Sequence, residues 1–175
     1  EYSSQTDTSL DENGQRKSEW YLCSKDTVKT CLMEPYLYEI SPGNVMLMTS
    51  VVAPVVVNNQ FRGVGGLDIN LPVLQERLLT QAQSLYAGKT SMFLLSTKNL
   101  VLASNQHPEL LGKPLESGDK ALANAITQSN QNQFIFNDDI ITVAPIKVDA
   151  VQNQWKMVIV TPRAIAYEVV DDLST

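Results

Sequence analysis

The longest apolar stretch of the chain, Val45 to Val57, places the strongest constraint on its fold. The stretch is rich in β-branched side chains and is broken by Pro54, which is typical of a buried strand and excludes a membrane span. Asn58-Asn59 is a turn signal, and the apolar pattern resumes from Phe61 to Ile69. We therefore predict a β-hairpin whose strands run from Met46 to Val57 and from Phe61 to Ile69.

The order of elements around this hairpin occurs twice. The tripeptide Val52-Ala53-Pro54 recurs as Val143-Ala144-Pro145, and a predicted hairpin follows each copy. Each hairpin then leads to a helix with proline near its start, at Leu71-Pro72 and at Thr161-Pro162. We predict an α+β fold of two related subdomains in tandem, each an antiparallel sheet flanked by helices.

The remaining pattern completes this plan. We divide the chain into residues 1–70, a linker helix at 71–89, residues 90–162 and a C-terminal helix at 163–175. Apolar runs bounded by turn residues predict the strands of the second subdomain, and an apolar periodicity predicts a helix. The strands are Ser91–Leu95, Leu100–Ala103, Phe134–Phe136, Ile140–Val148 and Trp155–Val160, and the helix is Asp119–Gln128.

The charge balance limits the class of partner. The chain of 175 residues carries 13 Lys and Arg against 19 Asp and Glu, for a formal net charge of −6. Without a basic patch a nucleic-acid partner is not expected. An acidic surface suits a cationic ligand better.

The two cysteines, Cys23 and Cys31, leave two alternatives open. Their spacing does not fit a CxxC motif, and the single His107 is too few further ligands for a zinc site. They form either a disulfide, which would indicate an oxidising compartment, or two buried free thiols. We favour the disulfide, and we expect His107 to lie on the surface.

An enzyme is not expected. The chain has no P-loop, no hydrolase signature and no paired-histidine metal motif, and its glycines Gly63, Gly65 and Gly66 do not form a dinucleotide-binding pattern. We predict no catalytic residue, no metal and no cofactor.

Several motifs carry a family resemblance. Trp20-Tyr21, Glu34-Pro35-Tyr36, Pro54 and the run Phe61 to Leu71 resemble the membrane-distal half of a double Cache sensor domain of bacterial methyl-accepting chemotaxis proteins. His107-Pro108, Gly112-Lys113 and the run Trp155 to Pro162 resemble the membrane-proximal half. The resemblance implies two PAS-like subdomains. The long N-terminal helix that such domains carry has no match in this sequence.

The resemblance also implies a setting. Residues 1–70 would be the membrane-distal, ligand-binding subdomain and residues 90–162 the membrane-proximal one, in the periplasmic part of an inner-membrane receptor. The helix at 163–175 would lead to a transmembrane segment outside this chain, and the receptor would be a homodimer. The same module on a histidine kinase or a diguanylate cyclase is the alternative.

The ligand follows from the same resemblance. It implies that Trp20 and Tyr21 frame the site and that Asp68 holds the ligand amine, with Tyr38 and Glu39 nearby. Aromatic faces and carboxylates suit a small cation, so a polyamine or biogenic amine is our first interpretation. An amino acid or taurine-like zwitterion is the alternative, although Ser18 stands where amino-acid-binding members carry arginine.

Other interpretations of these residues remain open at this stage. Trp20 and Tyr21 would be read as core aromatics without the resemblance. Glu34 is equally compatible with a solvated loop and with a pocket, and Tyr36 suggests packing more than ligand contact.

Overall fold

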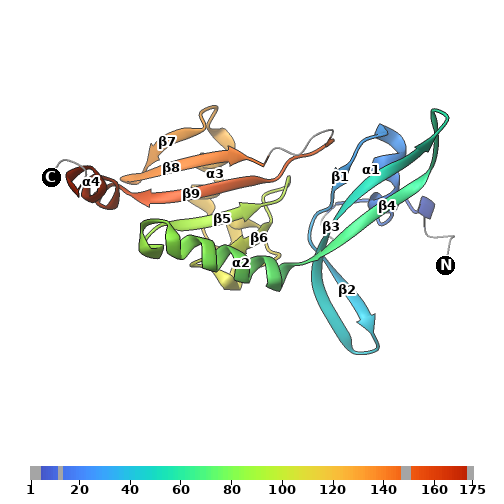
Figure 1. Ribbon diagram of the computed structural model, residues 1–175, viewed down its shortest axis with the longest axis horizontal. Helices are drawn as coiled ribbons and strands as arrows, with labels where there is room; N and C mark the ends of the chain where they lie inside the picture. Colours follow the sequence, from blue (N-terminus) through green and yellow to red (C-terminus); the bar gives the residue numbers. More distant parts are fainter. Residues whose placement is uncertain (1–4, 12–13, 147–150, 173–175) are drawn as a thin grey trace. The chain divides into compact units, whose positions relative to one another are not determined.

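The computed structural model describes residues 5–11, 14–146 and 151–172. The chain forms two compact units, which Figure 1 shows in ribbon form. The first unit comprises Glu1–Ile69 and Lys147–Gln154, and the second comprises Asn70–Ile146 and Trp155–Thr175. Residues 1–4, 173–175 and 147–148 of the predicted ranges lie outside the described residues.

The first unit is built around one long strand. Its elements are α1 (Glu19–Thr27), β1 (Cys31–Leu32), β2 (Tyr36–Ser41), β3 (Asn44–Val57) and β4 (Gln60–Asn70). Strand β3 pairs antiparallel with β1 and β2, and it also pairs with β4. Asn58 and Asn59 join β3 to β4 with φ angles of 52° and 59°, as the predicted two-residue turn requires.

Helix α1 packs on β3 and was not predicted. Its buried residues Leu22, Cys23 and Ser24 are consecutive in sequence, so they produce no apolar stripe at helical spacing. Cys23 belongs to a core that also includes Cys31, Met33 and Val52. A small core of this kind gives the first unit few apolar contacts to hold its helix.

The second unit repeats the plan with a wider sheet. Its strands β5 (Ser91–Leu95), β6 (Val101–Ser104), β7 (Gln133–Phe136), β8 (Asp139–Pro145) and β9 (Lys156–Pro162) lie in the order β6-β5-β9-β8-β7, all antiparallel. Its helices are α2 (Leu71–Ser84), α3 (Lys120–Gln128) and α4 (Arg163–Asp172), with short 3₁₀ turns η2 (Tyr86–Gly88), η3 (Pro108–Leu110) and η4 (Leu115–Ser117). The predicted α+β class with two antiparallel sheets is confirmed.

Two boundaries differ from the predicted division. Helix α2, predicted as a linker, packs on β6 within the second unit and buries Leu71 and Leu78. The side-chain amide of Gln75 holds it there, because it accepts a hydrogen bond from the backbone N–H of Ser104 (2.7 Å) and donates one to the Ser104 carbonyl. The second difference concerns the connection between β8 and β9, since residues 151–154 belong to the first unit.

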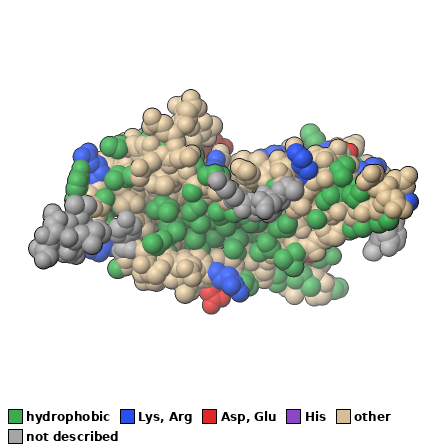
Figure 2. Space-filling model, turned by 45° about the horizontal axis from the view of Figure 1, so that its top comes forward, with side chains coloured by type: hydrophobic (Ala, Val, Ile, Leu, Met, Phe, Trp, Pro, Cys, Tyr) green, Lys and Arg blue, Asp and Glu red, His purple; other side chains and the backbone are tan. Residues whose placement is uncertain are grey.

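Apolar side chains reach the surface of both units, as Figure 2 shows for the face in view. In the first unit they concentrate on the hairpin of β2 and β3, where Leu37 is 71% exposed. No helix in the described part of the chain combines the length and the hydropathy needed to cross a bilayer.

Candidate ligand-binding site

A cavity of about 550 Å³ lies within the first unit. The segment before α1, the start of α1, residues 33–36 and the strands β2, β3 and β4 supply its walls. Its size falls in the range of roughly 300–1,000 Å³ that is usual for small-molecule sites.

Asp68 lies on β4 at the wall of this cavity. Its Oδ1 accepts a hydrogen bond from Ser50 Oγ at 2.6 Å and a longer one from Tyr36 OH at 3.3 Å. The two hydroxyl groups are 2.6 Å apart, and each has a single proton. The shortest contacts therefore favour two consecutive hydrogen bonds, in which Tyr36 donates to Ser50 and Ser50 donates to Asp68.

This arrangement leaves part of the Asp68 carboxylate for a ligand. Both protein contacts are made to Oδ1, so Oδ2 has no protein partner within the described residues. The side chain is exposed, and its two hydrogen-bond partners are neutral hydroxyls, not a basic group.

Tyr36 is half-buried, and burial raises the pKa of its phenol above the ordinary value. The hydrogen bond with Ser50 opposes this shift, while the nearby Asp68 charge adds to it. The phenol therefore remains protonated at neutral pH and keeps its proton for donation.

Glu34 is a cavity residue that the sequence did not single out as such. Its side chain is only 7% exposed. Glu-Pro steps are common in solvated loops, so no local pattern distinguishes this acid from a surface one. Only the burial of the segment between β1 and β2 brings it to the wall.

The cavity wall carries more acids than bases. Its acids are Asp11, Glu19, Glu34 and Asp68, and its bases are Arg16 and Lys17. The Arg16 guanidinium contacts Glu19 at 2.6 Å and Asp26 at 2.8 Å, and these contacts raise the pKa of Arg16. Because two carboxylates of the protein already engage it, Arg16 has little capacity left for a ligand anion.

Three of the five predicted ligand residues line the cavity, namely Trp20, Tyr38 and Asp68. Tyr21 lies instead between two aromatic rings, with its centroid 5.7 Å from that of Trp20 and 5.5 Å from that of Phe61. A direct role in ligand contact stays a prediction for all of them.

Glu39, the fifth predicted residue, turns away from the cavity. Its Oε1 accepts a hydrogen bond from the backbone N–H of Gly43 (2.8 Å) in the turn between β2 and β3. Successive side chains of a strand point to opposite faces, so Tyr36 and Tyr38 share the cavity face and Glu39 lies on the other. This alternation was readable from the sequence, but residues 36–41 were not recognised as a strand.

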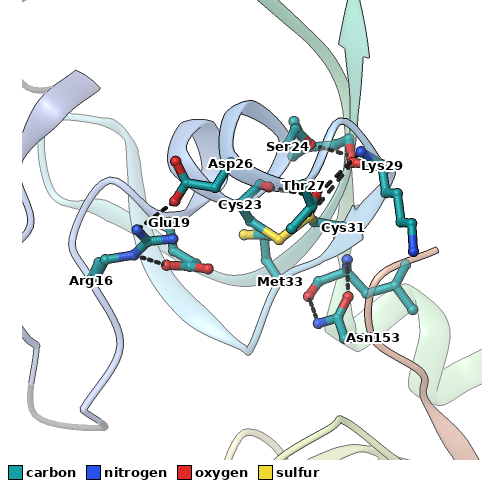
Figure 3. Close-up of a disulfide and its surroundings, with 12 residues drawn as sticks. Arg16, Glu19, Cys23, Ser24, Asp26, Thr27, Lys29, Cys31, Met33 and Asn153 are labelled. Carbon is teal, nitrogen blue, oxygen red and sulfur yellow. Dashed lines mark hydrogen bonds and ion pairs between the residues drawn. A yellow bond between two sulfur atoms is a disulfide. The ribbon is translucent and has the colours of Figure 1, made fainter.

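A disulfide joins α1 to β1 next to the cavity wall (Figure 3). It links Cys23 and Cys31, whose Cα atoms are 6.2 Å apart. Asn153 holds the residue after Cys31, because its Oδ1 accepts from the Leu32 N–H (2.8 Å) and its Nδ2 donates to the Leu32 carbonyl (2.5 Å). Covalent and hydrogen-bonded contacts thus fix the segment that leads to Met33 and Glu34.

Comparisons with known proteins find similar sequences among methyl-accepting chemotaxis proteins. Residues 2–76 match the family model for the first PDC sensor domain of methyl-accepting chemotaxis protein-like sequences. The chain is 29% identical over 162 residues to methyl-accepting chemotaxis protein TlpQ of Pseudomonas aeruginosa, and the match covers 90% of this chain. It spans only 22% of TlpQ, about a fifth of that protein's length.

Solved structures share the fold. A structure of methyl-accepting chemotaxis protein X is 27% identical with a TM-score of 0.59, and the match covers 89% of this chain and 62% of that one. The ligand-binding domain of the amino-acid chemoreceptor PctB of Pseudomonas aeruginosa, in complex with L-Arg, is 20% identical with a TM-score of 0.56, covering 93% and 67%. On these matches the chain is similar to the Cache sensor domains that methyl-accepting chemotaxis receptors carry.

Proposed function

We propose that the first unit binds a small cationic amine, such as a polyamine or biogenic amine, as the sensing step of a chemoreceptor. The observation that carries the proposal is the Asp68 carboxylate, which lines a 550 Å³ cavity and has no basic partner among the described residues. A ligand ammonium would supply that partner by a charge-assisted hydrogen bond.

The rest of the cavity wall supports the same chemistry. Trp20 and Tyr38 offer aromatic faces to a cation, and Glu34 supplies a second carboxylate that is nearly buried. Carboxylates and aromatic faces together stabilise an ammonium group and its apolar chain. An anionic ligand would meet four acids and gain little from the engaged Arg16.

An amino acid is the second candidate, and one observation favours it. Lys17 lies on the cavity wall and is the remaining base there that could pair with a ligand carboxylate. The fold likeness to PctB in complex with L-Arg is compatible with such a ligand. A lysine is a point charge without the bidentate geometry of arginine, so it would hold the carboxylate less specifically.

The receptor setting belongs to the same proposal. We place the chain on the periplasmic side of the inner membrane, in a homodimer whose flanking helices cross the membrane outside this chain. A ligand that binds one conformation of the first unit better than another would shift the population of the receptor. A histidine kinase or diguanylate cyclase output is the alternative, and the sequence after Thr175 would distinguish them.

Calorimetric titration tests the ligand class. The chain would be titrated with putrescine, spermidine, L-arginine, γ-aminobutyrate and taurine under one buffer condition. We expect putrescine or spermidine to bind more tightly than any zwitterion, with an affinity that falls as salt rises. Binding of the zwitterions alone would contradict the amine assignment while leaving the cavity as the site. No heat from any of the compounds would contradict the assignment of the ligand class altogether.

A further inference from the structure

The arginine at the wall of the first unit's cavity is held by two acids of the protein. The Arg16 guanidinium contacts Glu19 through Nε at 2.6 Å and Asp26 through Nη1 at 2.8 Å (Figure 3). Glu19 lies in the first turn of α1 and also lines the cavity, while Asp26 lies in the last turn of the same helix. One helix therefore supplies both acids to the arginine that precedes it.

The backbone around Arg16 is fixed by other contacts. Arg16 forms an isolated antiparallel bridge with Leu10, and the Lys17 N–H donates to the Ser9 carbonyl at 2.9 Å. The Arg16 carbonyl accepts from the Glu19 N–H at 3.0 Å. None of these contacts uses the carboxylate of either acid. Arg16 should therefore stay at the cavity wall when the two acidic side chains are removed.

The two ion pairs limit what Arg16 can offer to a ligand. A guanidinium recognises a carboxylate best when two of its nitrogens donate in parallel. Nε and Nη1 of Arg16 already donate to protein carboxylates, so only Nη2 has no carboxylate partner within the described part of the chain. A ligand carboxylate would have to displace Glu19 or Asp26 to obtain a second nitrogen. Two carboxylates against one guanidinium also leave this group of side chains net negative.

Selectivity between two ligands can come from an unfavourable contact with one of them. We propose that Glu19 and Asp26 determine the specificity of the cavity, because they keep Arg16 from binding a ligand carboxylate. An amine then binds better than the α-amino acid that carries the same amine chain. This role rests on the amine site proposed above and adds the reason why a carboxylate is rejected there.

Lys17, the other base on the cavity wall, does not replace Arg16 in this respect. Its side chain is exposed, and an exposed pair between a lysine and a carboxylate contributes little in water. A lysine also offers a point charge instead of two parallel donors. Release of Arg16 is thus the change that would let the cavity accept a zwitterion.

Two pairs of ligands isolate the effect of a single carboxylate. L-Ornithine is putrescine with an α-carboxylate, and L-lysine is cadaverine with an α-carboxylate. Calorimetric titration of the 175-residue chain would give the ratio of the two dissociation constants within each pair. We expect the wild type to bind each amine more tightly than its amino acid.

Removing both acids tests their role directly. Glu19→Ala with Asp26→Ala releases the guanidinium and should tighten the binding of L-ornithine and L-lysine at least about tenfold, the equivalent of one hydrogen bond to a charged group. Putrescine and cadaverine gain no partner and should bind no more tightly. Adding Arg16→Gln to this double variant should cancel the gain. Unfolding cannot produce a gain in affinity, so a damaged fold would not imitate the expected result.

Glu39→Ala is the matched control for the change in net charge. Glu19→Ala and Glu39→Ala each remove one acid from the first unit, but Glu39 bonds to the Gly43 N–H and does not line the cavity. We expect Glu19→Ala alone to narrow the ratio between L-ornithine and putrescine about threefold. Glu39→Ala should leave this ratio unchanged.

Three results would overturn the role of Glu19 and Asp26 while the amine site stands. These are an unchanged affinity for L-ornithine in the double variant, a gain that survives Arg16→Gln, and an equal effect of Glu39→Ala and Glu19→Ala. A wild type that prefers the amino acids, or that binds none of the four compounds, would instead contradict the amine site itself and this role with it.

Discussion

Binding of an amine at the proposed site depends most on the carboxylate of Asp68. Asp68→Ala removes the proposed partner of the ligand ammonium, and charge pairs of this kind contribute roughly 2–5 kcal/mol when desolvated. Since Asp68 keeps contact with water, we expect the lower end, about 2 kcal/mol or 30-fold in affinity. Titration calorimetry with the tightest-binding amine measures it.

Glu39→Ala is the matched control for this substitution. It removes an acid of the same unit that bonds to the hairpin turn and does not line the cavity. Equal losses in the two variants would mean that only the net charge of the unit matters. An unchanged affinity in Asp68→Ala would remove this residue from the site.

Tyr36 gives a prediction about pH. Because burial raises its pKa, the folded state holds the phenol proton more tightly than the unfolded chain does. This contribution to the free energy of unfolding is complete below the ordinary tyrosine pKa of about 10 and is lost as the pH rises through the folded-state pKa.

Urea unfolding of the wild type and of Tyr36→Phe at pH 8 and pH 10.5 tests this sign. At pH 8 the wild type should be more stable by about 0.5–1.5 kcal/mol, the usual net contribution of one hydrogen bond. The difference should shrink or reverse at pH 10.5. A difference that stays constant across the two pH values would show that the phenol proton is not involved.

The site was only partly predictable at the level of residues. Asp68 and Trp20 were named because the family resemblance covers their motifs, and both line the cavity. Tyr21 was named from the same resemblance and Glu39 for its chemistry, and neither lines the cavity, because neither argument tells which face a side chain takes. Glu34 was left undecided, since its burial results from tertiary packing.

At the scale of elements, the disulfide should determine how firmly α1 is held. Replacing both cysteines by alanine frees a short loop, and closing such a loop is worth roughly 2–3 kcal/mol. Only a few buried residues of α1 contact the sheet, so we expect most of this loss in the first unit. Chemical unfolding followed by Trp20 fluorescence measures it, and an equal midpoint for both proteins would contradict it.

The Asn153 side chain should stabilise β1 more than the side chains of the residues next to Asn153 do. Asn153→Ala leaves the N–H and the carbonyl of the buried Leu32 without their side-chain partner, at a cost of about 1–3 kcal/mol. Hydrogen exchange at the Leu32 amide should accelerate accordingly. Gln152→Ala is the control, because Gln152 contributes its backbone N–H to Thr30 while its side chain is exposed.

The two outcomes for Asn153 are distinct. If the Leu32 amide exchanges equally fast in the wild type and in Asn153→Ala, the hydrogen bonds do not hold β1. If Gln152→Ala accelerates exchange as much, the backbone pairing of this segment and not the Asn153 side chain is responsible.

Helices and strands whose apolar residues are regularly spaced were predicted well, and the other elements were not. The β3–β4 hairpin follows from a β-branched run and its turn residues, the strands β8 and β9 follow from apolar runs, and α3 follows from its apolar stripe. Helix α1 lacks such a stripe, and β1 has two residues, too few for an alternation. Residues 151–154 belong to the first unit because they contact Thr30 and Leu32. No local sequence pattern predicts these long-range contacts.

At the scale of the whole molecule, each unit carries one tryptophan. Trp20 lies in the first unit and Trp155 in the second, so Trp155→Phe and Trp20→Phe each leave a reporter for one unit. The chain passes between the units three times, after Ile69, Ile146 and Gln154. Each unit nevertheless has its own core and its own antiparallel sheet.

With these two tryptophans we can predict how much a bound ligand stabilises each unit. A ligand at 100 times its dissociation constant stabilises the state that binds it by about 2.7 kcal/mol. An amine in the first unit should therefore raise the thermal midpoint seen by Trp20 in Trp155→Phe more than the midpoint seen by Trp155 in Trp20→Phe. Because Trp20 itself lines the cavity, the second variant also needs a higher amine concentration to reach the same occupancy. Equal shifts of the two thermal midpoints at matched occupancy would contradict this expectation. They would mean that the two units unfold in a single cooperative transition.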